Sequence, residues 1–215
     1  ECNNHFKNCM GKFKNESDQD YLKRQLSELE EKINEVGAEN ICALIGETQL
    51  GSLVGDVPPL KDYWSKVYEI CSKNNIHVIL DEVYCGMGRS GKMFNYSWYD
   101  FSPDFVCVGK NMTSGHAPLS AIITKSKFQD IIAKGSGRIQ LGHTFQGYSL
   151  GVAACNELIN IIDEDKLMDK VCEKGSYMMD ILKNELMENP FFKNIRGKGF
   201  AFSLEHQTSN NPKFG

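Results

Sequence analysis

The sequence has no uninterrupted apolar run long enough to cross a bilayer, and residues 1–15 are polar rather than a basic segment followed by an apolar one. We therefore expect a soluble, cytoplasmic protein with no membrane partner. Lysine and arginine are scattered and the formal net charge is -4, so the chain lacks the basic stripe that binds phosphate backbones. Nucleic acid is excluded as an expected partner.

None of the eight cysteines stands in a CxxC pair. Four of them lie inside apolar runs: Cys42, Cys71, Cys107 and Cys155. These are expected to be small buried hydrophobic residues in a reducing compartment. Cys2 and Cys9 are widely spaced and lack a matching second pair, so a disulfide or zinc site there has little support, and no metal is expected.

Short apolar strands alternate with helical patterns in the first three quarters of the chain. A helix is predicted from a Ser17–Asp18 cap to a stop at Gly37, and a second one runs through Trp64 and Val67. The predicted strands cover residues 41–45, 77–80, 105–108 and 119–124. Uninterrupted apolar strands of this kind predict an α/β fold, with a parallel-rich sheet and helices on both faces.

The pattern changes after residue 147. Residues 148–162 predict a buried helix, residues 167–186 an amphipathic helix, and residues 195–205 a strand interrupted by two glycines. We therefore expect a large domain over residues 1–164 and the start of a smaller α+β domain over residues 165–215. The chain begins at Glu1 rather than methionine and ends after a polar stretch, so a fragment of a longer protein is expected.

Two carboxylates, Asp81 and Glu82, follow a predicted buried strand, at the edge where parallel sheets hold their ligands. Residues 86–92 also match GxxxxGK, the pattern of a phosphate loop in nucleotide hydrolases. Three points argue against that alternative. Met93 offers no hydroxyl for magnesium, no clear helix follows, and one strand would have to supply both the loop and the magnesium carboxylate.

A second interpretation rests on several motifs in order. They are DEVYCGMGRSGK (81–92), SPD (102–104), VGKNMTSG (108–115), PL (118–119) and HTFQG (143–147). Together they resemble the class III aminotransferase family, with a match running from about Glu39 to Glu205. The resemblance implies a pyridoxal 5'-phosphate (PLP) enzyme of fold type I, with the large domain of an aspartate-aminotransferase-like fold.

Carried onto this sequence, the resemblance implies that Lys110 is the Schiff-base lysine and that Asp81 pairs with the protonated ring nitrogen of PLP. A buried carboxylate favours that charged ring, which can then take up electrons when the substrate loses a proton. A neutral Lys110 amine can afterwards move that proton. Val83, two residues after Asp81 in a segment assumed to be extended, matches the position that packs on the ring.

Other matched positions carry weaker roles. Tyr84 lies where relatives often carry glutamine near the ring oxygen, and Glu47 matches an acid near the pocket. Thr144 matches a threonine that reaches the cofactor phosphate of the neighbouring subunit, which implies a homodimer with shared active sites. The remaining polar residues, His116, His143 and Arg196, are expected to be structural.

The sequence also departs from the family pattern. Asn111 and Ser120 replace glycines, and Thr48 replaces a proline. Ser52 stands where some relatives carry glutamate, which favours the branch that handles ω-amino compounds. The upstream segment that holds the cofactor phosphate and the downstream arginine that binds the substrate carboxylate have no counterpart.

The expected function is ping-pong transfer of an amino group from an amine or amino acid to a keto acid or aldehyde. Isomerisation (an aminomutase) or decarboxylation with the same cofactor remains open, because all three reactions begin from the same imine. So does a non-catalytic remnant that acts through protein contacts.

Overall fold

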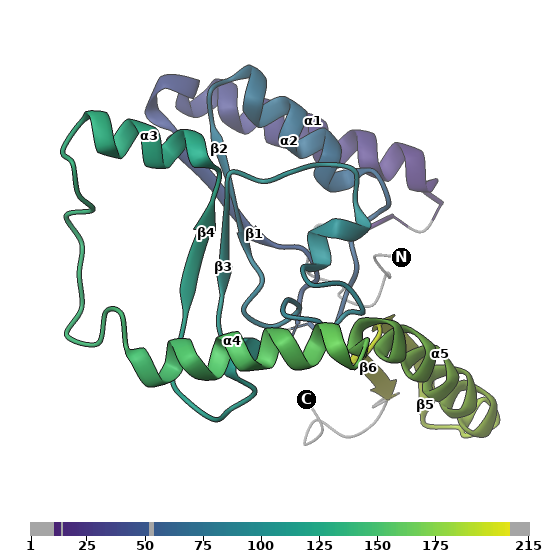
Figure 1. Ribbon diagram of the computed structural model, residues 1–215. Coiled ribbons are helices and arrows are strands. Elements are labelled where there is room, and N and C mark those ends of the chain that lie inside the picture. Colours follow the sequence, from purple (N-terminus) through teal and green to yellow (C-terminus); the bar gives the residue numbers. More distant parts are fainter. Residues whose placement is uncertain (1–10, 14, 52–53, 207–215) are drawn as a thin grey trace.

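A computed structural model describes residues 11–13, 15–51 and 54–206 (Figure 1). The helices are α1 (Asp18–Val36), α2 (Tyr63–Lys73), α3 (Ser126–Lys134), α4 (Ser149–Glu164) and α5 (Leu167–Leu186). The strands are β1 (Ala43–Glu47), β2 (His77–Asp81), β3 (Phe105–Val108), β4 (Ala121–Thr124), β5 (Phe192–Lys198) and β6 (Ala201–His206). Three short 3-10 turns are η1 (Ala38–Asn40), η2 (Asn95–Trp98) and η3 (Lys110–Thr113). None of the helices in these ranges has the length and apolarity needed to cross a membrane.

The first four strands form one sheet in the order β1-β2-β3-β4. The pairs β1–β2 and β2–β3 are parallel, and β4 is antiparallel to β3. This confirms an α/β fold with a mostly parallel sheet, made mixed by β4. Their runs of branched apolar residues suit strands that are buried in a sheet between other layers.

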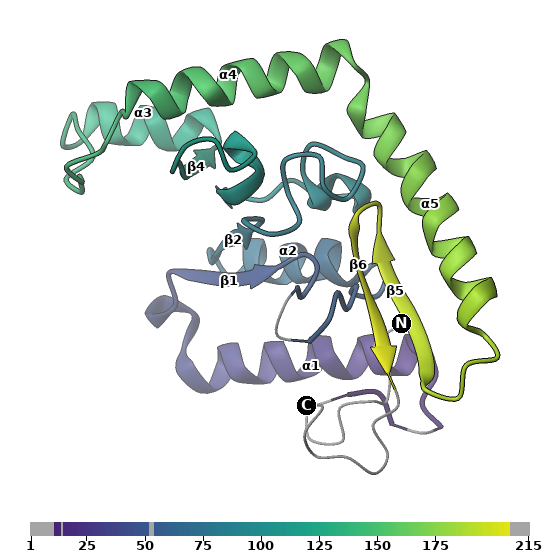
Figure 2. The ribbon, with the colours of Figure 1, turned by 90° about the horizontal axis from the view of Figure 1, so that it is seen from below.

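Helix α1 begins and ends where its sequence signals predict. The Ser17 side chain accepts a hydrogen bond from the backbone N–H of Asp20, which satisfies one of the free donors of the first turn. At the other end Gly37 has φ 84°, and its N–H donates to the carbonyl of Ile33. Its apolar stripe faces α2, and the two helices lie side by side in both views (Figures 1 and 2).

Helices α1 and α2 cover one face of the sheet. Trp64 and Val67 of α2 share a core with Val78 and Leu80 of β2 and with Ile33 of α1. Trp64 packs closely on β1 because Gly46 has no side chain beneath the indole ring. A Cβ built on Gly46 would lie 2.8 Å from the Trp64 ring.

The opposite face is exposed on β1 and β4. The register aligns Ile45 with Ile79, so both point away from the core side chains of β2. Ile45 is 65% exposed and Ile122 of β4 is 68% exposed. The predicted second layer of helices is therefore not formed at these positions by the part of the chain described.

The C-terminal part differs from the sequence predictions in two ways. Helix α4 was expected to be buried, but most of its side chains are exposed, because it contacts η3 along one side and α5 at its end. The single strand expected at 195–205 is an antiparallel hairpin, β5–β6, which lies against α5 (Figure 2). The chain reverses at Gly199, whose φ of 56° favours glycine. A glycine that looked like an interruption is thus the turn.

The one-sided core predicts a contrast between two apolar truncations. Leu80→Ala removes a side chain that is 0% exposed and should lower the free energy of unfolding by about 2–5 kcal/mol. Ile122→Ala, on the open face, should change it by less than about 1 kcal/mol. Urea unfolding followed by circular dichroism measures both, and equal losses would contradict the described packing.

Candidate active site at the carboxyl edge of the sheet

The parallel register brings three of the predicted site residues to one edge. Glu47 pairs with Asp81 across β1 and β2, and Asp81 pairs with Cys107 across β2 and β3. Lys110 follows two residues after the last residue of β3. Because parallel strands end on the same side, Glu47, Asp81 and Lys110 all lie at the carboxyl edge, where open α/β sheets bind ligands.

The Asp81 carboxylate is half-buried and is held at one oxygen. Its Oδ1 accepts a hydrogen bond of 2.9 Å from the backbone N–H of Val83, and no bond to Oδ2 occurs within the described ranges. The assumption of an extended Asp81–Val83 segment is wrong, because β2 ends at Asp81 and Val83 starts a series of turns. Val83 nevertheless lies at the edge, since a Cβ on Gly109 would be 3.5 Å from its Cγ1.

Lys110 starts η3 in an unusual backbone conformation. Its φ is 41°, a left-handed value that costs free energy for a residue with a side chain. Such residues persist where the surroundings fix them, and they cluster at functional sites. Next to it, the Oδ1 of Asn111 accepts a hydrogen bond of 3.1 Å from Arg89, which anchors the turn. The Lys110 side chain is exposed, and its Nζ lies 5.8 Å from the centre of the Tyr84 ring.

Tyr84 turns its hydroxyl away from Lys110. The hydroxyl donates to Oδ2 of Asp56 over 3.3 Å, and the ring packs on Gly51, where a Cβ would lie 2.7 Å from Cδ1. Burial, together with the bond to Asp56, raises the pKa of Tyr84 to about 12, so the phenol stays protonated. The face of the ring, rather than the hydroxyl, is thus the part of Tyr84 turned toward Lys110.

Sequence reasoning placed Glu82 beside Asp81 at this edge but did not predict that it anchors the surrounding loops. Glu82 accepts hydrogen bonds from the backbone N–H groups of Asn95 (2.6 Å) and Tyr96 (2.7 Å) and from the hydroxyl of Thr48 (3.1 Å). These bonds fasten the loop after residue 86 and the end of β1 to β2. Burial raises the pKa of Glu82 to about 7, against the lowering effect of its three donors. Only its place beside Asp81 hinted at this role.

Glu47 has a local partner of its own. Its Oε2 accepts a hydrogen bond of 3.2 Å from the N–H of Gly51, which ties the start of the following loop to β1.

Arg196 bonds to the carbonyls of Gly55 (2.6 Å) and Val54 (3.1 Å) and to Glu205, in keeping with the structural role expected for it.

Thr144 is not brought to this edge by the chain itself. It is exposed, as is His143 beside it, in the segment between α3 and α4, and no contact with Lys110 or Asp81 occurs among the described residues. Its role toward a neighbouring subunit stays a prediction. The expectations for Cys2, Cys9 and Ser52 fall outside the described residues.

The phosphate-loop alternative finds no support in the geometry. Residues 83–94 form turns and bends that lead into the short 3-10 turn η2, so the glycine-rich segment does not run directly into an α-helix as a phosphate loop does. The ammonium of Lys92 lies 5.0 Å from the centre of the Trp98 ring.

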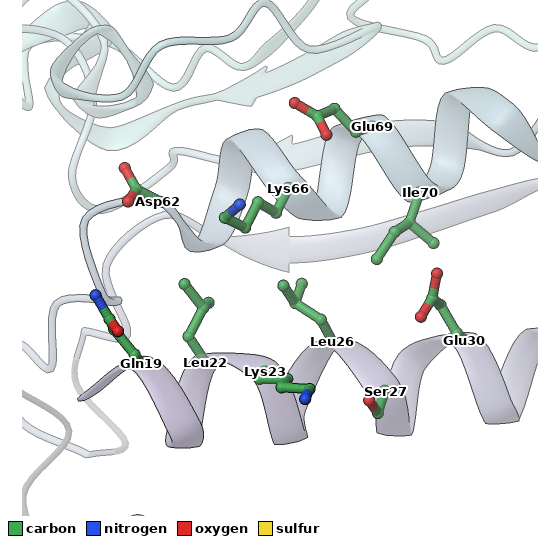
Figure 3. Close-up of a pocket in the computed structure, with 10 residues that line it drawn as sticks. All are labelled: Gln19, Leu22, Lys23, Leu26, Ser27, Glu30, Asp62, Lys66, Glu69 and Ile70. Carbon is green, nitrogen blue, oxygen red and sulfur yellow. The ribbon is translucent and has the colours of Figure 1, made fainter. Parts of the chain in front are cut away.

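A separate groove of about 580 Å³ lies between α1 and α2 (Figure 3). Its floor is apolar, with Leu22, Leu26 and Ile70, and its rim carries charges of both signs, such as Lys66 and Glu69. It lies on the helical layer and contains none of the residues of the carboxyl edge.

The Glu82 environment predicts a pH-dependent stability. Because its folded pKa of about 7 exceeds the ordinary 4.5, the folded protein binds a proton more tightly than the unfolded chain between these values. The contribution of Glu82 to the free energy of unfolding should therefore fall by about 3 kcal/mol as the pH rises from 4.5 to 7, and then level off. Urea unfolding across this range should show that Glu82→Gln lacks this fall and that Glu69→Gln, at an exposed position, keeps it. A Glu82→Gln curve parallel to wild type would contradict the assignment.

Comparison with known proteins gives the site its context. The family described as Aminotransferase class-III matches residues 5–214. An aminotransferase of Gibberella zeae is 36% identical over 91% of this chain and 38% of its own length. Putrescine–pyruvate aminotransferase of Pseudomonas aeruginosa is 35% identical over 83% of this chain and 39% of its own length. The chain thus spans about two fifths of the length of these relatives.

Solved structures agree in fold. The (S)-enantioselective omega-transaminase of Thermomicrobium roseum superimposes with a TM-score of 0.84 at 31% identity, over 91% of this chain and 43% of that one. The taurine:2-oxoglutarate aminotransferase of Bifidobacterium kashiwanohense, solved with PLP and glutamate, superimposes with a TM-score of 0.82 at 27% identity. The match covers 87% of this chain and 41% of that one. With a family match across nearly its whole length, the chain belongs to the class III aminotransferases.

Proposed function

We propose that this protein is a PLP-dependent aminotransferase that moves an amino group from an amine or amino acid to a keto acid or aldehyde by a ping-pong mechanism. The observation that carries the proposal is a lysine in a strained backbone conformation, Lys110, at the same sheet edge as Asp81. Family membership supplies the reaction class.

The residues at this edge fit the chemical demands of PLP. A pyridine nitrogen requires an acid, and Oδ2 of Asp81 has no other bond within the described part of the chain. An aldehyde requires an amine, and Lys110, which follows β3 at that edge, has an exposed side chain. Val83 and the Tyr84 ring offer apolar surfaces, and Glu47 adds an acid beside Asp81. The phosphate would be held in part by Thr144 of a second subunit.

Bound PLP supplies an aldehyde for the substrate's amine and a ring that accepts electrons. Asp81 keeps the ring nitrogen protonated by offering it a charged acceptor. The Nζ of Lys110 would hold the cofactor's aldehyde covalently, and when freed by the substrate's amine it would carry the proton from the substrate's α-carbon to the cofactor's aldehyde carbon. The left-handed φ of Lys110 and the Arg89–Asn111 hydrogen bond define the backbone position from which the lysine side chain extends. Proton transfer needs an amine held in a defined position.

Several finer features belong to the same proposal. Relatives are named for diaminobutyrate, putrescine and taurine, which supports an amine or ω-amino substrate here. We further propose a cytoplasmic homodimer with shared sites, helices on both faces of the complete sheet, and a division into residues 1–164 and 165–215. Exposed Ile45 and Ile122 support a second layer supplied from outside the described residues.

Two alternatives remain. An aminomutase or decarboxylase would use the same lysine and acid. A non-catalytic remnant draws on the two-fifths coverage of the relatives.

The lysine assignment makes a spectroscopic prediction. The full-length protein with PLP should show a visible absorbance band that borohydride bleaches, because the imine is conjugated with the ring. Lys110→Ala should lose the band and the borohydride-fixed adduct found by mass spectrometry, whereas Lys134→Ala, at an exposed position on α3, should keep both. An adduct on another lysine would contradict the assignment.

The acid assignment makes a prediction about affinity. Asp81→Asn removes the charge that favours a protonated ring nitrogen, so the dissociation constant for PLP should rise about 10- to 100-fold. Absorbance titration measures the constant, with Asp100→Asn at an exposed loop position as the control. Equal constants for Asp81→Asn and wild type would remove Asp81 from the site.

A further inference from the structure

A second buried carboxylate, Asp56, stands in the loop between β1 and α2. It accepts hydrogen bonds from the Gln49 amide (3.0 Å), the Tyr84 hydroxyl (3.3 Å) and the Ser203 hydroxyl. Its φ of 55° is left-handed, and within the described residues it forms no ion pair. A buried acid with three neutral donors and no cation is costly to desolvate, so its retention calls for a specific role.

One side of this cluster is the C-terminal hairpin. Ser203 belongs to β6, and the Gln49 amide that bonds to Asp56 also donates to the carbonyl of Ala201 over 2.8 Å. Arg196 of β5 adds its bonds to the carbonyls of Val54 and Gly55. The hairpin therefore holds the loop that carries Asp56 through both of its strands.

The other side of the cluster is the carboxyl edge. The same loop begins with Gly51, on which the Tyr84 ring packs, and Asp56 holds the hydroxyl of that ring. The tyrosine is thus fixed at its face and at its tip by one loop. The amine of Lys110 lies over this ring at 5.8 Å.

Resting on the proposed cofactor site, we propose that Asp56 is a positioning residue: it sets the Tyr84 ring against Lys110 and couples the β5–β6 hairpin to that site. A shift of the hairpin moves Ser203 and Ala201, and through Asp56 and Gln49 it moves the support of Tyr84. Coupling between two sites is reciprocal, so a cofactor bound beside Lys110 and Tyr84 stabilises the hairpin, and an ordered hairpin strengthens cofactor binding.

The test uses the full-length protein, PLP as the probe, and three variants. Asp56→Asn removes the charge with little change of shape, Tyr84→Phe removes the hydroxyl, and Asp62→Asn changes an exposed acid in the same loop as a control. PLP affinity comes from the absorbance titration. Hydrogen exchange of residues 201–203, with and without PLP, reports on the hairpin. If Asp56→Asn does not fold, Ser203→Ala takes its place, because it removes one of the hydrogen bonds to the Asp56 carboxylate.

We expect PLP to slow exchange at residues 201–203 in wild type and Asp62→Asn. In Asp56→Asn this slowing should shrink at least about fivefold and the PLP dissociation constant should rise about tenfold. Tyr84→Phe should likewise raise the PLP dissociation constant and reduce the slowing of exchange at residues 201–203. The variant that combines Asp56→Asn with Tyr84→Phe should have nearly the same PLP dissociation constant as Asp56→Asn alone, because the two residues act through one hydrogen bond.

A second readout does not depend on the cofactor. Alkaline titration of phenolate absorbance, taken as the difference from Tyr84→Phe, should show the Tyr84 pKa moving from about 12 toward its ordinary value in Asp56→Asn. An unchanged Tyr84 pKa in Asp56→Asn would show that the carboxylate does not hold the tyrosine hydroxyl.

The outcomes separate the two proposals. A wild-type protein with no cofactor band overturns the proposed function and this inference with it. A normal band, combined with unchanged affinity and unchanged hairpin protection in Asp56→Asn, overturns the role of Asp56 alone.

Discussion

The parallel register of β1, β2 and β3 is the constraint on which the site depends. It places Glu47, Asp81 and the end of β3 in one row, and the chain then needs only a short turn to present Lys110. A shift of one residue in β2 would turn Asp81 into the helical layer and Leu80 out of it. The core of Val78 and Leu80 against α2 opposes such a shift, so packing on one face fixes the chemistry at the other.

Buried carboxylates, together with hydrophobic contacts, fasten the loops around this edge. Glu82 collects two backbone N–H groups from the loop that follows, and Asp56 collects donors from three separate segments. Both carboxylates are buried, and their hydrogen bonds are directional. Such anchors add directional bonds to the apolar contacts that the loops also make, such as that of Met87 with the Val106 cluster.

The open face of the sheet and most of α4 are exposed among the described residues. Ile45 and Ile122 expose apolar area beside the row that holds Asp81. The described residues cover about two fifths of the length of the related enzymes, and the second helical layer over this face belongs to the proposed complete fold.

The sequence by itself determined the α/β alternation, most element positions, the family and the pairing of Asp81 with Lys110 as candidate site residues. These follow from local periodicity, from caps such as Ser17 and Gly37, and from motifs whose order is read along the chain. The tertiary structure alone decided the antiparallel β4, the β5–β6 hairpin, the direction of the Tyr84 hydroxyl and the hydrogen-bond partners of Asp56 and Glu82. Strand direction and the partners of a buried acid depend on residues far away in the chain. Asp56 meets Ser203 across 147 positions, and no local pattern records such a contact.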